Sequence, residues 1–147
     1  MTFQNELQKS LVVSLTTLLD SLGVDYFFGG SRRFGYFVYD SDVDIFLSSS
    51  CEKNQQKIID TIEEAGFVLN ESFTHDPEYG DRVYRIMDFI HLVFIEDEYL
   101  FLANKMNHIS IERMIDENPI LLDVVNSLRN FCHRGSEIYK ILFDVCN

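Results

Sequence analysis

The sequence has no tryptophan, only two prolines and only three cysteines among its 147 residues. The cysteines are odd in number and widely spaced, which fits neither a disulfide framework nor a zinc site. Reduced thiols in a cytoplasmic protein are therefore expected. No low-complexity run occurs, so little of the chain has the composition of a disordered segment.

Long apolar runs and positive charge are also scarce. No stretch reaches the length of a membrane-spanning helix, and the first ten residues include acidic and polar side chains, so neither a membrane span nor a signal peptide is expected. The sequence has 12 Lys and Arg residues and 24 Asp and Glu residues, which gives a formal net charge of −12. Because affinity for phosphate backbones comes mainly from Lys and Arg, this balance argues against a protein that coats nucleic acid. It leaves room for a local pocket that binds one nucleotide.

The length is that of a single domain, residues 1–147, large enough to bury a core. Apolar residues at three- and four-residue steps predict an amphipathic helix from Gln4 to Leu22, which Gly23 ends. The other elements expected in the first half are strands at Val24–Phe28, Val43–Leu47 and Phe67–Leu69, and a helix between Ser49 and Gly66.

The second half begins with a polar loop at His75–Asp81. Arg82–Ile95 is rich in branched and aromatic residues and predicts either one long strand or a tight hairpin. After Glu96 the pattern is helical, with an interruption at Pro119, and His108 is expected to cap a helix or face solvent. The pattern predicts an α/β core of about residues 1–97 and a helical tail of about residues 98–147.

The most informative segment places a small turn ahead of two carboxylates. A strand runs into Gly29-Gly30-Ser31, and ten residues separate Ser31 from Asp42 and the nearby Asp44. Residues two apart on a strand point to the same side, so these like charges repel unless a cation lies between them. The turn offers backbone N–H groups to phosphates. Together these groups are what metal-assisted transfer of a nucleotide requires.

Two other ligand-binding patterns fail on this sequence. Asp40, Asp42 and Asp44 have the alternating spacing of a calcium-binding EF-hand loop, but Ile45 stands where that loop needs glycine and Cys51 where it needs an acid. Neither a G-x-G-x-x-G dinucleotide fingerprint nor a Gly-Lys-Ser/Thr phosphate loop is present.

The stretch GSRRFGYFVYDSDVDIFL resembles the signature of the DNA polymerase β-type nucleotidyltransferase superfamily, particularly its small, minimal members. In that signature a Gly-Ser turn is followed by Asp-x-Asp on a strand, with an intervening glycine, here Gly35, and a serine before the first aspartate, here Ser41. The order of elements extends the resemblance loosely to residue 95. It implies an α/β (α+β) fold: a small mixed twisted sheet with helices packed on it, plus a helical C-terminal extension.

The resemblance also implies roles for particular residues. Two magnesium ions, with manganese as the other candidate, would be bound by Asp42 and Asp44. The nucleotide phosphates would be met by the turn and the residues after it: Gly29, Gly30, Ser31, Arg32 and Arg33.

The third carboxylate that the family supplies from a later strand has two candidates here. Asp88 is the preferred candidate because it has the right chemistry. His91 is the alternative in its place, because it lies in Ile90–Ile95, the more convincing central strand. On one continuous strand the two would point to opposite faces, so only one of them would reach the site. A histidine there would bind metal, act as a base, or mark a protein that has lost catalysis.

The expected activity is metal-dependent transfer of a nucleoside monophosphate from an NTP, with ATP the first candidate, to a hydroxyl acceptor. That acceptor is a small molecule, a protein or an RNA end. The alternative is a catalytically inactive nucleotidyltransferase-like protein with a binding or regulatory role. The chain is short for an enzyme that must also grip a large acceptor, so a second subunit or a protein partner could complete the site.

Overall fold

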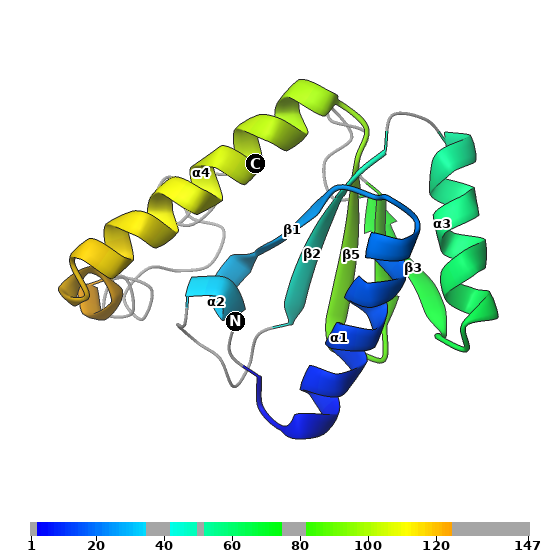
Figure 1. The fold of residues 1–147 in the computed structure, drawn as a ribbon, viewed down its shortest axis with the longest axis horizontal. Coiled ribbons are helices and arrows are strands. Elements are labelled where there is room, and N and C mark those ends of the chain that lie inside the picture. Colours follow the sequence, from blue (N-terminus) through cyan, green and yellow to red (C-terminus); the bar gives the residue numbers. More distant parts are fainter. Residues whose placement is uncertain (1–2, 35–41, 50–51, 75–81, 125–147) are drawn as a thin grey trace.

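The computed structural model describes residues 3–34, 42–49, 52–74 and 82–124. The predicted loop at 75–81, the glycine and serine of the motif at positions 35 and 41, and the helices predicted beyond residue 124 lie outside these ranges. Figure 1 shows helices packed against a sheet, and the elements in chain order are α1 (Glu6–Ser21), β1 (Tyr26–Gly29), α2 (Gly30–Phe34), β2 (Val43–Ser48), α3 (Glu52–Glu64), β3 (Leu69–Thr74), β4 (Arg82–Ile86), β5 (Ile90–Ile95) and α4 (Glu98–Glu117).

The sheet is mixed and has the strand order β1-β2-β5-β4-β3. Its central pair, β2 and β5, is parallel, and the other neighbouring strands are antiparallel. The connection between the parallel strands contains α3 and the antiparallel strands β3 and β4. This is the α+β arrangement of a mixed sheet with packed helices that the sequence predicts.

The first helix follows the sequence prediction closely. Its N-cap Asn5 accepts a hydrogen bond from the Gln8 N–H, which satisfies a donor that the helix itself leaves unpaired. Gly23, at a φ of +68°, follows the helix in the left-handed region that glycine adopts without strain. The helix buries an apolar face on the sheet through Val12, Leu15 and Leu19.

The two faces of the sheet carry different apolar clusters. One face packs against α1 and α3, and its central strands contribute Val43, Ile45, Leu47, Leu92 and Phe94. The alternate residues of the same strands point to the other face, where α4 packs (Figure 1).

Helix α4 begins where the acidic run Glu96-Asp97-Glu98 predicts a helix start. Asp97 caps it by accepting a hydrogen bond from the Leu100 N–H at 3.0 Å. The helix ends at Glu117, and its C-cap Asn118 directly precedes Pro119. Within the described residues, no helix has the length and apolar character needed to cross a membrane.

Residues 82–95 form the tight hairpin, one of the two predicted alternatives. Met87 and Asp88 have φ values of +54° and +63°, and the Phe89 N–H donates to the Ile86 carbonyl at 3.3 Å. Two consecutive residues of positive φ are typical of the type I′ turn that joins antiparallel strands.

The strand predicted at Phe67–Leu69 is wrong in its bounds, because β3 is Leu69–Thr74. Asn70 and Glu71, both exposed, lie on this outermost strand of the sheet. An edge strand with polar residues carries little of the apolar signal from which strands are predicted.

Candidate functional site

One row of residues crosses the sheet from edge to edge on the α4 face. Strand pairing places Gly29 opposite Asp44, Asp44 opposite His91, His91 opposite Arg85 and Arg85 opposite Asn70. Residues that are directly opposite on paired strands project from the same face. The sheet therefore gathers into one line the turn, an aspartate, a histidine and an arginine that are far apart in the sequence.

The next row on this face is apolar and lies under α4. Phe27 pairs with Phe46, Phe46 with Val93, and Val93 with Val83. Phe101 of α4 packs on this row and is only 1% exposed. The polar row remains accessible, because the exposed fractions of the Asp44, His91 and Arg85 side chains are 28%, 20% and 44%.

The His91 imidazole lies between the two predicted metal-binding aspartates. Its Nε2 is 3.4 Å from Oδ2 of Asp42, and its Nδ1 is 3.3 Å from Oδ1 of Asp44. Nη2 of Arg85 is 3.6 Å from the same Asp42 oxygen. The hydrogen bond to Asp44 and the charges of both aspartates raise the pKa of His91, against the opposing effects of burial and of Arg85.

The glycine turn lies directly against Asp44. Gly30 has a φ of +68°, and a Cβ on it would collide with Oδ2 of Asp44. A Cβ on Gly29 would collide with the Phe46 ring and would lie 2.8 Å from Nε2 of His108. The double glycine is therefore more than a flexible turn, because its missing side chains let the backbone approach the carboxylate and the helix. Ser31 follows in the first turn of α2, and its side chain lies outside what the structure describes.

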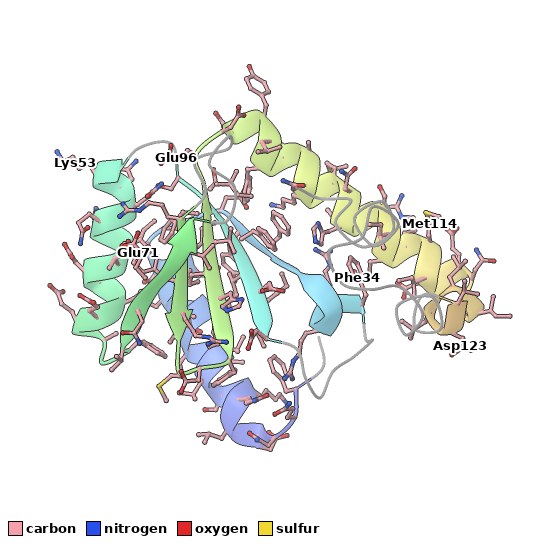
Figure 2. The ribbon with its side chains drawn as sticks, turned by 180° about the vertical axis from the view of Figure 1, so that it is seen from behind. Phe34, Lys53, Glu71, Glu96, Met114 and Asp123 are labelled. Carbon is pink, nitrogen blue, oxygen red and sulfur yellow. The ribbon has the colours of Figure 1, made fainter. Side chains whose placement is uncertain are left out.

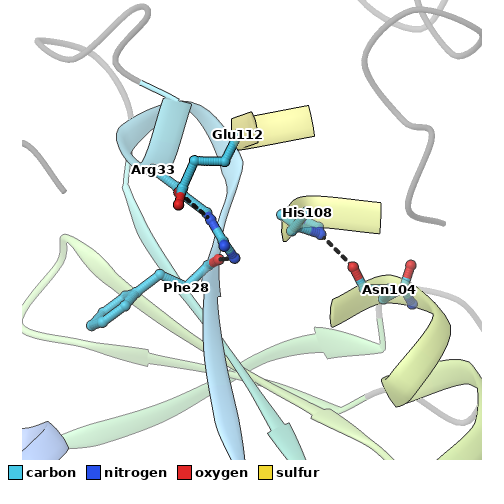
Figure 3. A network of polar contacts seen from close by, with 5 residues as sticks. All are labelled: Phe28, Arg33, Asn104, His108 and Glu112. Carbon is cyan, nitrogen blue, oxygen red and sulfur yellow. Dashed lines mark hydrogen bonds and ion pairs between the residues drawn. The ribbon is translucent and has the colours of Figure 1, made fainter. Parts of the chain in front are cut away.

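The two arginines after the turn make contacts with the protein itself. Arg32 is 1% exposed, and its Nη1 donates to Oε1 of Gln8 in α1 at 3.3 Å. Burial lowers the pKa of Arg32, and the charge of Asp42 opposes this effect. Nε of Arg33 donates to Oε2 of Glu112 at 2.8 Å, and its Nη1 donates to the Phe28 carbonyl at 2.7 Å (Figure 3). The arginines thus link the turn to α1 and to α4.

The expectation that His108 caps a helix or faces solvent is wrong. This residue is 3% exposed, and its ring packs against Phe27, Phe34 and Phe46. Its Nδ1 lies 2.8 Å from the Asn104 carbonyl (Figure 3), and burial is the main reason that its pKa is lowered. Phe34, at the end of α2, lies beside α4 in Figure 2. Glu112 and His108 are the supporting residues that sequence reasoning missed, since only the packing of α4 brings them to the turn.

Of the two candidates for the position of a third carboxylate, His91 lies against both aspartates. Asp88 lies in the hairpin turn, at a φ of +63°. The turn interrupts the strand, so the alternation argument for a continuous strand does not apply.

The two aspartates fit a magnesium ion by their chemistry and their accessibility. Both side chains are less than a third exposed and offer the oxygen ligands that Mg²⁺ prefers. Asp44 directs Oδ1 to His91, whereas its Oδ2 lies toward Gly30. Within the described ranges, no group of three His, Cys, Asp or Glu side chains is arranged to bind a metal ion.

Comparison of the fold with solved structures gives clear matches. A mutant of Cid1 poly(U) polymerase bound to MgATP aligns with a TM-score of 0.59 at 13% identity, over 86% of this chain and 42% of that one. A cytoplasmic RNA terminal U-transferase aligns with a TM-score of 0.60 at 14% identity, over 86% of this chain and 39% of that one. The chain shares the fold of these two nucleotidyltransferases, a mixed sheet with helices packed on it.

The alignments extend over most of this chain but over less than half of each of these neighbours. Cid1 in complex with its short product ApU aligns with a TM-score of 0.60 at 13% identity, over 95% of this chain and 42% of that one. The chain thus spans about two fifths of the length of the solved structures that it matches. No family model and no curated protein matches the sequence.

Proposed function

We propose that this chain binds an NTP together with Mg²⁺ and transfers its nucleoside monophosphate to a hydroxyl acceptor. The observation that carries the proposal is the close approach of the Gly30 backbone to the Asp44 carboxylate. A phosphate-binding turn and a metal-binding carboxylate must be neighbours if both are to act on one triphosphate.

Each part of the site has a role in this reaction. Backbone N–H groups of Gly30 and Ser31 bind phosphate oxygens, and the carboxylates of Asp42 and Asp44 bind Mg²⁺. Magnesium, when bound, neutralises the charge of the triphosphate and of the pyrophosphate that leaves. Arg32 and Arg33 position the turn through their contacts with α1 and α4. Direct contact of these arginines with phosphate stays a prediction.

The neighbours support the choice of nucleotide. Cid1 poly(U) polymerase has been solved in complexes with MgATP, MgGTP and a UTP analogue. We take ATP as the first nucleotide to test, with UTP and GTP beside it. The acceptor is a small molecule, a protein or an RNA end.

The test is calorimetric titration of each NTP with and without Mg²⁺, on wild type and on the Asp44→Asn variant. We expect binding that needs Mg²⁺, and an affinity loss of about 100-fold or more in the variant, about 2.7 kcal/mol, because one metal-binding charge is removed. Asp60→Asn is the matched control, since Asp60 is exposed on α3 and contacts Gln56. The proposal is wrong if Asp44→Asn binds the nucleotide and Mg²⁺ as wild type does.

A second candidate function is that of a nucleotide-binding protein without catalysis. It is favoured by His91 and Arg85, which lie against the aspartates where a third carboxylate is expected. Release of pyrophosphate from the bound NTP, measured over several acceptors, distinguishes the two. Metal-dependent binding of the NTP without release of pyrophosphate would favour the second candidate function. The chain would then bind a regulatory partner and would transfer nothing to an acceptor.

A further inference from the structure

The two oxygens of the Asp44 carboxylate face different surroundings. Oδ2 lies against Gly30, on the side of the phosphate-binding turn. Oδ1 lies 3.3 Å from Nδ1 of His91, on the side of β5. The two oxygens of this carboxylate therefore face the glycine turn on one side and an imidazole on the other.

Asp42 also has nitrogen-bearing side chains beside its carboxylate, on the side of β5. Oδ2 of Asp42 is 3.4 Å from Nε2 of His91 and 3.6 Å from Nη2 of Arg85. The guanidinium of Arg85 is always charged and repels a cation placed beside it.

This arrangement suits one magnesium ion better than two. Mg²⁺ requires an octahedral shell of oxygen ligands, and imidazole is a ligand that other metals prefer. An ion beside Oδ2 of Asp44 would have the triphosphate and water oxygens as further ligands. An ion on the β5 side would meet His91 and Arg85 instead of a third carboxylate.

We propose that the site binds a single Mg²⁺ with each nucleotide, because His91 stands where a second ion would need a third carboxylate. The inference rests on the proposed function, because it assumes that the NTP binds at this site. In the absence of a second ion, the positive charge beside the aspartates on the β5 side comes from Arg85.

The experiment counts magnesium directly. Wild-type protein is dialysed to equilibrium with Mg²⁺ and a non-hydrolysable ATP analogue, and bound Mg²⁺ is measured by atomic absorption against bound nucleotide. We expect a ratio of one in wild type and of two in His91→Asp, because the variant places a third carboxylate between Asp42 and Asp44. His91→Asn, which removes the imidazole without adding an acid, should keep a ratio of one.

Asn107→Asp is the matched control for added charge, since Asn107 is exposed on α4, and its ratio should stay at one. A ratio of two in wild type would overturn the inference and leave the proposed function intact. A ratio of one in a folded His91→Asp would overturn the role of His91. Nucleotide binding that needs no Mg²⁺ would instead refute the proposed function. If His91→Asp does not fold, the wild-type ratio alone decides between one ion and two.

Discussion

Gly30 combines a backbone conformation that favours glycine with a close approach to the Asp44 carboxylate. Its φ of +68° is one that other residues rarely adopt, and the space of its missing Cβ is filled by Asp44. Gly23 has the same φ, but a Cβ there would meet nothing within 4 Å. The two glycines therefore separate the cost of the conformation from the cost of displacing the carboxylate.

We expect Gly23→Ala to lose about 1–2 kcal/mol of stability, because it forces alanine into the left-handed region. Gly30→Ala should lose more, because its Cβ must also displace the Asp44 carboxylate. Only Gly30→Ala should weaken metal-dependent NTP binding, by about tenfold or more, since Asp44 must move. Urea unfolding and calorimetry measure the two effects. Equal affinities in the two variants would show that the contact between Gly30 and Asp44 has no part in binding.

The arginines show how far single residues could be assigned from the sequence. The resemblance to the nucleotidyltransferase signature predicts that both arginines lie near the phosphates, and that role stays a prediction. The structure adds contacts that the sequence did not indicate, to Gln8 for Arg32 and to Glu112 for Arg33. Those partners are 24 and 79 residues away in sequence, so only packing of the helices reveals them.

Helix α4 is the element that completes the site face of the sheet. Its start and end could be read from Asp97 and Pro119, because caps and proline act locally. Its contribution to the site could not be predicted from the sequence, because Phe101, His108 and Glu112 contact residues of β1 and α2 that are distant in sequence.

The attachment of α4 to the sheet should depend strongly on Phe101. We expect Phe101→Ala to lower the free energy of unfolding by about 3–5 kcal/mol, because it leaves a cavity over the apolar row of the sheet. Tyr99→Ala is the matched aromatic control, since Tyr99 is 86% exposed, and it should change stability by less than about 0.5 kcal/mol.

Urea unfolding measures both variants. If Phe101→Ala were no less stable than Tyr99→Ala, α4 would not be held to the sheet by this side chain. The comparison needs no ligand, so it tests the fold independently of the proposed function.

For the whole molecule, the net charge bears on which class of acceptor the chain can bind. The solved neighbours include an RNA terminal U-transferase, whereas this chain carries a formal net charge of −12. Attraction to a polyanion comes from Lys and Arg, of which the chain has 12 against 24 acidic residues.

We therefore expect the chain by itself to bind single-stranded RNA more weakly than a Kd of about 10⁻⁴ M at physiological salt. Fluorescence anisotropy with a labelled RNA of mixed sequence is the measurement, and MgATP binding by the same preparation is the control. A micromolar Kd that weakens steeply as salt is added would contradict this expectation and favour an RNA end as acceptor.

The sequence by itself determined the features that depend on neighbouring residues: the amphipathic first helix, the glycine turn, and the strand that carries Asp44 and directly follows Asp42. The nucleotidyltransferase fold was predicted from the resemblance of this segment to a known signature. Tertiary structure alone decided what lies opposite those aspartates. The hairpin turn at Met87–Asp88 and the parallel pairing of β2 with β5 bring His91 and Arg85 to them. Strand register depends on contacts between residues that are distant in sequence, so it cannot be predicted from the local periodicity of one strand.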